Sequence, residues 1–270
     1  RWPTSGADIA EYVARSTVFS LVIEFVYSFI ELASLLWLSG WNHRTNSMSH
    51  PPCLLLSPTQ FERSAIVSHL GERKLEGTLA QVCGFGPVAA AARTSSLISE
   101  HRPDMVVLAG IAGSLDAQCS VGEAYEFLRV RSYGIGVGNG EQFQSVGEIG
   151  WRHVQEESDT VPEGVGDVLH KTDGKRKLEN RFGIDGELLS VCAASSSQTE
   201  ADEKKKRYAD ALAEDMEGFA VATACVIHSV PWVIVRGISN HAGDRDKTNW
   251  QADRALQKVA ERVGEILAGK

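Results

Sequence analysis

From Cys53 to the C-terminus, short apolar runs of strand length alternate with segments of helical periodicity. This alternation is typical of a largely buried sheet that is flanked by helices. With 270 residues, of which 43% are hydrophobic, the chain can bury one substantial core. The pattern therefore predicts an α/β domain with a shorter appendage in front of it.

The apolar runs and the helical patterns give specific expected boundaries. We expect strands at Leu54–Ser57, Leu79–Cys83, Met105–Ala109, Glu123–Val130, Leu188–Ala193 and Trp232–Gly237. We expect helices at Glu62–Leu70, Val88–Glu100, Ala201–Tyr208, Glu217–His228 and Trp250–Leu267. Polar residues and glycines dominate between Ser132 and Gly186, where we expect irregular loops over one side of a pocket, anchored by Phe143 and Trp151.

The first 47 residues do not share this pattern. The stretch Val18–Trp41 is apolar and long enough to cross a bilayer. Glu24 and Glu31 lie on one helical face of it, and each carboxylate near a membrane centre would cost about 2.5 to 3.5 kcal/mol. This cost disfavours a membrane span. We expect residues 1–47 to be a non-catalytic extension and residues 48–270 to be the catalytic domain.

The charge and the cysteine and histidine patterns exclude several classes of function. The net charge is −8 and no stripe of Lys and Arg is present, so we expect a small-molecule partner and no nucleic acid, whose binding depends on cationic groups. Five cysteines without a CxxC pair are typical of reduced thiols in a cytoplasmic protein. Eight histidines without metal-ligand spacing predict no metal, and we expect no cofactor.

A glycine-rich turn, Gly84-Phe85-Gly86-Pro87-Val88-Ala89, follows the second predicted strand and fits the pattern G-x-G-x-x-A. That pattern also occurs where proteins bind dinucleotides. A dinucleotide site needs an acidic residue at the end of the next strand, which here ends Leu108-Ala109-Gly110. A tight strand-to-helix turn is therefore the better interpretation.

A second segment of small residues, Ala109-Gly110-Ile111-Ala112-Gly113-Ser114, directly follows a predicted buried strand. Small residues let a ligand approach the backbone closely and bond to its free N–H groups. A simple turn would have the same composition. We expect Ile111, Ala112 and Gly113 to contact a substrate.

The most specific motif has two halves that are separated by a predicted helix: Glu214-Asp215-Met216-Glu217-Gly218 and Val235-Arg236-Gly237-Ile238-Ser239-Asn240. Acids before an apolar helix could be a solvated first turn, which the helix dipole favours. Met216 and Gly218, however, place groups suited to an apolar ring among these acids. Asn240 follows a strand, and ligands of α/β sheets gather beyond the carboxyl ends of strands.

Taken in this order, the motifs resemble those of the nucleoside phosphorylase and nucleosidase superfamily, and within it they are most similar to the futalosine hydrolases. The resemblance spans roughly Cys53 to the C-terminus and is most specific from Glu214 to Trp250. It implies a three-layer α/β/α sandwich with a mixed, partly barrel-like central sheet, a homo-oligomer, and cleavage of a purine–ribose bond.

The resemblance also implies roles for two carboxylates. Cleavage of an N-glycosidic bond develops positive charge on the ribose and negative charge on the purine. Glu217 resembles the glutamate that binds the ribose hydroxyls and stabilises the cationic sugar. Glu62, which alone would be an ordinary glutamate at a helix N-terminus, matches the base that deprotonates the attacking water. We expect Asp215 and Met216 to contact the substrate.

The nucleophile is predicted from missing phosphate ligands. Phosphorylases of this superfamily carry an arginine and a serine or threonine around the glycine-rich segment, because a phosphate needs cationic and hydroxyl ligands. The corresponding positions here are Leu108 and Ile111, and an apolar pair cannot bind a dianion. We therefore expect water to be the nucleophile.

The preference for a base is predicted from Asn240. Adenosine-type nucleosidases of the superfamily have an aspartate there, which can protonate the purine at N7. An asparagine amide can donate to a 6-oxo group and accept from a protonated N7, which suits hypoxanthine, although it could also only cap a turn. An amide releases no proton at neutral pH, so solvent or a neighbour such as Asp244 would supply the proton.

Together these expectations predict hydrolysis of futalosine to hypoxanthine and dehypoxanthinylfutalosine, a step of menaquinone biosynthesis. Two alternatives stay open, because a fold does not fix a function. One is a methylthioadenosine or adenosylhomocysteine nucleosidase, and the other is a non-catalytic nucleoside-binding protein with the same fold. No membrane contact is expected for the catalytic domain.

Overall fold

The computed structural model describes residues 52–156, 163–171 and 183–269. The apolar stretch Val18–Trp41 and the predicted extension 1–47 lie outside these residues. Within the described ranges, no helix combines the length and the apolar character that crossing a membrane requires.

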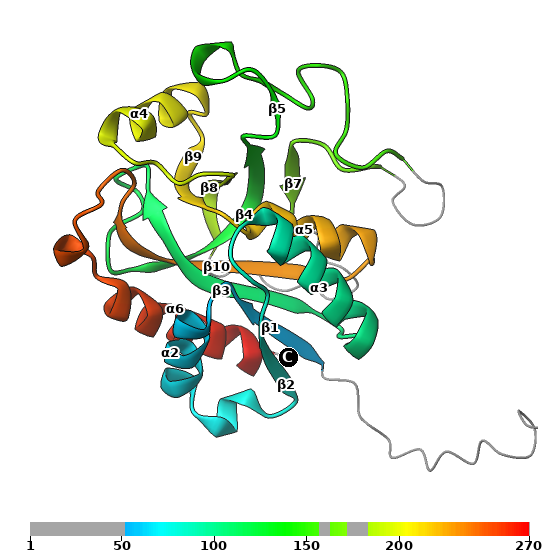
Figure 1. Ribbon diagram of the computed structural model, residues 1–270. Coiled ribbons are helices and arrows are strands. Elements are labelled where there is room, and N and C mark those ends of the chain that lie inside the picture. Colours follow the sequence, from blue (N-terminus) through cyan, green and yellow to red (C-terminus); the bar gives the residue numbers. More distant parts are fainter. Residues whose placement is uncertain (1–51, 157–162, 172–182, 270) are drawn as a thin grey trace, which may run out of the picture. The chain divides into compact units, whose positions relative to one another are not determined.

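Eight of the described strands form one mixed sheet (Figure 1). They are β1 (Cys53–Ser57), β2 (Thr78–Val82), β3 (Val106–Ser114), β4 (Ala124–Tyr133), β7 (Val168–His170), β8 (Gly183–Val191), β9 (Ala211–Asp215) and β10 (Trp232–His241). The strand order is β10-β4-β8-β9-β3-β1-β2, and β10 also pairs with β3. That extra pairing joins β3, β10, β4, β8 and β9 into a closed ring, so the sheet is a barrel that continues into the flat pair β1 and β2.

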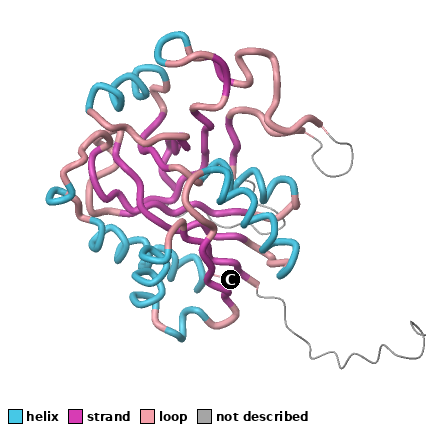
Figure 2. The backbone as a smooth tube through the Cα atoms, viewed as in Figure 1, coloured by secondary structure: helices cyan, strands magenta, loops and turns pink. Residues whose placement is uncertain are grey.

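Helices cover both faces of the sheet (Figure 2). They are α2 (Gln60–Leu70), α3 (Pro87–His101), α4 (Gln198–Arg207), α5 (Gly218–Ile227) and α6 (Ala252–Ala268), with short 3-10 turns η1 (Glu72–Leu75), η2 (Gly140–Gln142) and η3 (Lys247–Asn249). A small separate hairpin pairs β5 (Gly136–Val137) with β6 (Gln144–Ser145).

Strand β1 shows why the strands have continuous apolar sequences. Leu54 and Leu56 belong to the core cluster beneath α3 and α5, whereas Cys53 and Leu55 belong to the cluster beneath α2 and α6. A strand buried on both faces needs apolar residues at every position rather than at alternate ones. The two clusters confirm the predicted three-layer α/β/α sandwich with a mixed, barrel-like central sheet.

The structure corrects several expected boundaries. Strand β9 was missed, because its last two residues, Glu214 and Asp215, resemble the polar start of a helix rather than a strand. The segment of small residues from Ala109 to Ser114 is the second half of β3 and not a turn. Asn240 lies within β10 rather than beyond its end.

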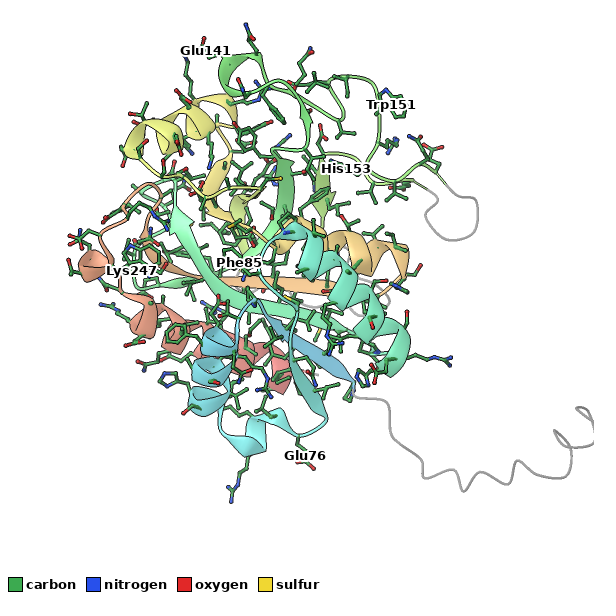
Figure 3. All side chains as sticks on the ribbon, viewed as in Figure 1. Glu76, Phe85, Glu141, Trp151, His153 and Lys247 are labelled. Carbon is green, nitrogen blue, oxygen red and sulfur yellow. The ribbon has the colours of Figure 1, made fainter. Side chains whose placement is uncertain are left out.

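Of the two aromatic residues expected to anchor the region 132–186, only Phe143 is buried. Phe143 is buried and packs edge-on against Tyr133, with 5.0 Å between the ring centroids. Trp151, in contrast, is 66% exposed and lies at the periphery of the described residues (Figure 3). The expectation that Trp151 is an anchor is therefore wrong for this chain.

Candidate active site

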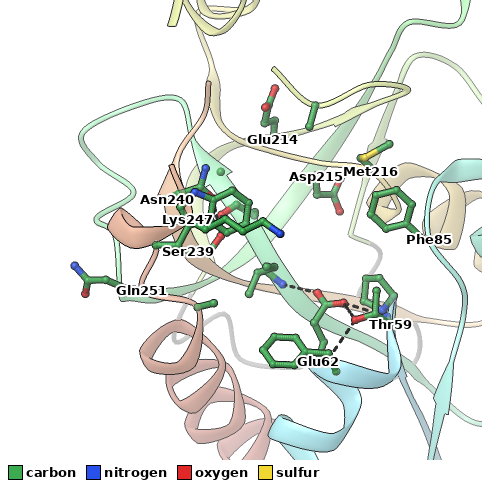
Figure 4. A pocket seen from close by; sticks show the side chains of 18 of the residues that line it. Thr59, Glu62, Phe85, Glu214, Asp215, Met216, Ser239, Asn240, Lys247 and Gln251 are labelled. Carbon is green, nitrogen blue, oxygen red and sulfur yellow. Dashed lines mark hydrogen bonds between the residues drawn. The ribbon is translucent and has the colours of Figure 1, made fainter. Parts of the chain in front are cut away.

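A cavity of about 800 Å³ opens where β3, β9 and β10 end (Figure 4). The predicted site residues that line it are Glu62, Ile111, Ala112, Gly113, Asp215, Met216, Glu217 and Asn240. Its wall also includes residues without a predicted role, namely Thr59, Phe61, Phe85, Ala194, Glu214, Ser239, Arg245, Lys247, Trp250 and Arg254. The cavity thus brings together side chains from motifs that lie far apart in the sequence.

Glu62 is held rigidly at the first turn of α2. Thr59 caps this helix, and the Glu62 carboxylate accepts hydrogen bonds in return from the Thr59 backbone N (3.0 Å) and Oγ (2.6 Å). The other carboxylate oxygen, Oε1, accepts from the backbone N of Ile111 at 3.0 Å. Glu62 is only 4% exposed. A capping box therefore fixes this carboxylate against the middle of β3.

Gly110 makes this approach possible. A Cβ atom at this position would lie 2.6 Å from Glu62 Oε1, 2.5 Å from Arg236 Nη1 and 2.9 Å from Pro58 Cδ. Since both polar atoms lie so close to one point, they are also close to each other. The missing side chain of Gly110 therefore leaves the space in which the Arg236 guanidinium and the Glu62 carboxylate both approach β3.

We expect Gly110→Ala to lower kcat/KM by about 100-fold, because even a small displacement of a catalytic group has that effect. Overpacking should also lower the free energy of unfolding by about 1 to 3 kcal/mol. Gly166→Ala is the matched control, since its Cβ would meet no atom within 4 Å. Steady-state kinetics and thermal unfolding of both variants test this, and unchanged kinetics in Gly110→Ala would show that the close approach is not needed.

Glu217 lies at the N-cap of α5 and is 4% exposed. Its Oε1 accepts a hydrogen bond from the backbone N of Gly86 at 2.9 Å, and its Oε2 lies 3.3 Å from Arg236 Nη2. Burial raises the pKa of Glu217 to about 7, against the lowering effect of Arg236 and with a further increase from Asp215. The glycine-rich turn therefore uses its Gly86 N–H to hold a carboxylate, whereas a dinucleotide site would leave it for a phosphate.

Arg236 is a site residue for which the sequence suggested no role. It is fully buried in β10, and its Nε and Nη2 donate to Asp215 Oδ2 at 2.9 and 2.5 Å. With the contact to Glu217, one cation bridges two buried acids. A single arginine within the apolar run of β10 is the signal that could have identified it, because an arginine is rarely buried without a charged partner.

The carboxylate of Asp215 is bonded to Arg236 and to the start of α5. Besides Arg236, its carboxylate accepts from Ser190 Oγ at 2.5 Å and from the backbone N of Gly218 at 2.8 Å, and its side chain has no exposed surface. These bonds fix the start of α5, where Glu217 lies. Asp215 was expected to contact the substrate; it belongs to the cavity wall, and the bonds of its carboxylate position the start of α5.

Asn240 faces the cavity with one free group. Its Oδ1 accepts from Ser239 Oγ at 2.7 Å, and its Nδ2 donates to the backbone carbonyls of His241 (2.8 Å) and Asp244 (3.3 Å). An amide nitrogen has two hydrogens, and both are used here. Only Oδ1, which has a second lone pair, remains available to a ligand, so the expected donation to a 6-oxo group is not supported.

Asp244 does not join the other predicted site residues. Its Oδ1 accepts from the backbone N of Asp246 at 2.9 Å and its Oδ2 from Asn249 Nδ2 at 3.1 Å, and it is absent from the cavity wall. These bonds shape the loop between β10 and η3. The structure therefore gives the Asp244 carboxylate a role in the loop and places it outside the cavity wall.

The strand segment Ile111, Ala112 and Gly113 forms an apolar part of the wall. Leu108, the other position compared with phosphorylases, is fully buried.

The thiol of Cys83, which lies near the two glutamates and Arg236, has its pKa raised to about 12 by burial, so it is not ionised near neutral pH. In the parts of the chain that the structure describes, no group of three or more His, Cys, Asp and Glu side chains could hold a metal ion.

Comparisons with known proteins give a consistent result. The sequence model of the phosphorylase superfamily matches residues 169–269. A futalosine hydrolase of Streptomyces coelicolor is 29% identical over 213 residues, which is 77% of this chain and 85% of that protein. A 5'-methylthioadenosine/S-adenosylhomocysteine nucleosidase of Staphylococcus aureus is 28% identical over 188 residues, which is 66% of this chain and 73% of that protein.

A solved structure supports the fold. The 5'-methylthioadenosine/S-adenosylhomocysteine nucleosidase of Colwellia psychrerythraea, in complex with adenine, superposes with a TM-score of 0.62 at 20% identity and covers 80% of this chain and 94% of that chain. In sequence and in fold, the chain is thus similar to the futalosine hydrolases and nucleosidases of the phosphorylase superfamily.

Proposed function

We propose that this chain hydrolyses the N-glycosidic bond of futalosine and releases hypoxanthine and dehypoxanthinylfutalosine, as a step of menaquinone biosynthesis. The observation that carries the proposal is the convergence of Glu62, Glu217 and Asn240 on one cavity. Two fixed carboxylates can serve the two faces of a sugar, and an amide can hold the leaving base. The resemblance to futalosine hydrolases supports this choice of substrate.

Glu217 acts at the ribose. In its ionised form it accepts hydrogen bonds from the ribose hydroxyls and stabilises the positive charge that develops as the C–N bond breaks. Its contacts with Gly86 and Arg236 hold it in place before the substrate binds. Because it needs no reorganisation at the moment of reaction, its electrostatic effect on the transition state is large.

Glu62 activates the attacking water. Its Oε1 accepts one hydrogen bond in the free protein, from Ile111, and keeps a lone pair for a water molecule. The water oxygen forms a bond to the anomeric carbon, its proton passes to Glu62, and the bonding electron pair leaves with the purine. Arg236 does not act as a phosphate-binding cation, because its charge is already paired with Asp215 and Glu217. The nucleophile is therefore water rather than phosphate.

Asn240 acts at the purine. A purine leaves more readily when N7 carries a proton, and the free lone pair of Asn240 Oδ1 accepts a hydrogen bond from that N7–H. Because the amide is not acidic near neutral pH, we propose that solvent supplies the proton. The bonds of Asn240 to Ser239 and to the following loop keep its oxygen directed at the base.

The test of this function is a chromatographic assay for free base. Purified protein is incubated with futalosine and, separately, with methylthioadenosine, each with and without phosphate. We expect hypoxanthine release from futalosine that does not depend on phosphate. Faster release of adenine from methylthioadenosine would instead establish the second candidate, a nucleosidase, which the similarity to the Staphylococcus aureus protein supports.

The raised pKa of Glu217 predicts an acid limb in the pH profile. Since the ionised form is the active one and its pKa is about 7, kcat/KM should fall by about tenfold between pH 8 and pH 6 as this carboxylate is protonated. The measurement is the pH profile of kcat/KM from initial rates. A profile that stays flat between these pH values would contradict the ionised role of Glu217.

We also propose that the chain acts in the cytoplasm as a homo-oligomer, as the resemblance implies. Phe85 and Val88, at the start of α3, are 68% and 84% exposed, and Phe85 also lines the cavity. Apolar side chains of this size beside a site are typical of surfaces that meet a partner. Light scattering of the purified protein measures the oligomeric state.

A further inference from the structure

The base-binding end of the cavity has more than one polar group. Asn240 Nδ2 is engaged by two backbone carbonyls, so in this structure Asn240 offers only an acceptor for N7–H. An acceptor at N7 does not distinguish a 6-oxopurine from a 6-aminopurine, since either base can carry that proton. Recognition of the base therefore needs a second residue on the same wall.

The strand register places Glu214 opposite Asn240. Gly113 of β3 is the Cα partner of Asn240 in β10 and of Glu214 in β9. Register partners direct their side chains to the same face of a sheet, and all three residues line the cavity. Two strand spacings separate the Cα atoms of the outer pair by roughly 10 Å. Figure 4 shows Glu214 and Asn240 on the same side of the cavity, away from Glu62.

Glu214 is a buried hydrogen-bond acceptor that is paired with Lys204. Its Oε2 accepts from Lys204 Nζ at 2.8 Å and from Ser195 Oγ at 2.9 Å, whereas its Oε1 accepts only from the backbone N of Ser195 at 2.7 Å. The residue is 4% exposed, and Lys204 compensates its charge. Oε1 therefore has one lone pair that no hydrogen bond among the described residues uses.

The two loops beside Glu214 pack tightly against each other. The turn after β10 lies against the loop before α4, so closely that a Cβ on Gly243 would come within 2.4 Å of the Ser197 carbonyl. Ser195 is fully buried. A buried carboxylate that a ligand leaves without a donor costs free energy, so a site of this kind discriminates between ligands.

We propose that Glu214 recognises the N1–H group of a 6-oxopurine and thereby determines which nucleosides this site accepts. The proposal rests on the proposed function and extends it to the base. Hypoxanthine carries a hydrogen on N1, which a carboxylate accepts. Adenine has a lone pair on N1, which a carboxylate repels. Lys204 and the backbone N–H of Ser195 fix the carboxylate at the required position.

The test compares futalosine with its 6-amino counterpart, so that the sugar and its 5′ substituent stay the same. For the wild type we expect kcat/KM to favour the 6-oxo substrate by about 100-fold or more. In Glu214→Gln the amide can donate to the N1 of a 6-aminopurine, so this preference should fall by about tenfold or more. A preference that stays within twofold of the wild-type value would overturn the proposal.

Ser195→Ala is the matched control for a residue that only fastens the loop. It removes one donor to Glu214 Oε2 and leaves the carboxylate in place. We expect it to change the rates with both substrates by a similar factor and to keep their ratio. If Ser195→Ala and Glu214→Gln alter the ratio equally, Glu214 acts only by holding the loop, and the proposal is wrong.

Two further measurements keep the test decisive. If Glu214→Gln does not fold because Lys204 loses its partner, the double variant Glu214→Gln with Lys204→Met removes both charges and takes its place. Calorimetric dissociation constants for free hypoxanthine and adenine need no turnover. They separate the proposed hydrolysis from the proposed role of Glu214. Tighter binding of hypoxanthine that is lost in Glu214→Gln supports the role of Glu214 even if no nucleoside is cleaved. Equal binding of both bases by the wild type overturns that role.

Discussion

Glu62→Gln should retain binding of futalosine and lose most of its hydrolysis, with kcat lowered by about 1,000-fold and KM nearly unchanged. The amide keeps an oxygen that can accept from Thr59 or Ile111, so α2 and its cap should persist. It cannot take a proton from water, and the attacking oxygen then lacks its base. Initial rates over a range of substrate concentrations give both constants.

Glu100→Gln is a suitable control for this substitution, because Glu100 lies on α3, outside the cavity, with its side chain 62% exposed. Its kinetics should match the wild type. Circular dichroism and thermal unfolding then show whether Glu62→Gln has kept the fold. A folded Glu62→Gln variant with full kcat would exclude Glu62 as the base.

Glu217→Gln is expected to affect both binding and catalysis, with kcat/KM lowered by about 1,000-fold at pH 8. The substitution keeps the size of the side chain and an acceptor for Gly86, but it removes the charge that stabilises the cationic sugar. KM should rise as well, because the ribose hydroxyls lose a charged acceptor.

The pH profile separates this role from a structural one. The wild-type acid limb arises from the pKa of about 7 at Glu217, so the limb should be absent from the residual activity of Glu217→Gln. A variant that is equally slow but keeps the same limb would assign the limb to another group. Unchanged turnover in Glu217→Gln would remove Glu217 from the site.

The sequence predicts the sandwich because each of its signals is local. Strand β1 is apolar from Cys53 to Leu56, and α6 has one apolar face, with Leu256, Val259 and Val263 buried. Strand β9 is missed for a physical reason: Glu214 and Asp215 are acids inside a strand, and their partners Lys204 and Arg236 come from other elements. No local pattern shows that such charges will be neutralised after folding.

The candidate site is predicted unevenly for the same reason. Glu62, Glu217 and Asn240 were selected because their motifs resemble those of a known superfamily, and the cavity does bring them together. The functions of Asp215 and Glu214 depend on the register of β9 against β3, which no single segment encodes. The orientation of the Asn240 amide likewise depends on the last residue of β10 and the loop that follows it, because His241 and Asp244 provide the two acceptors.

The most direct test of hydrolysis at this site follows the oxygen atom that water contributes. The reaction is run with futalosine in water enriched in oxygen-18, in the presence of phosphate, and the sugar product is examined by mass spectrometry. Attack by water predicts one heavy oxygen on the sugar product and no sugar phosphate. A phosphorylated sugar without the heavy label would show that phosphate is the nucleophile, and the roles given to Glu62 and Glu217 would then be wrong.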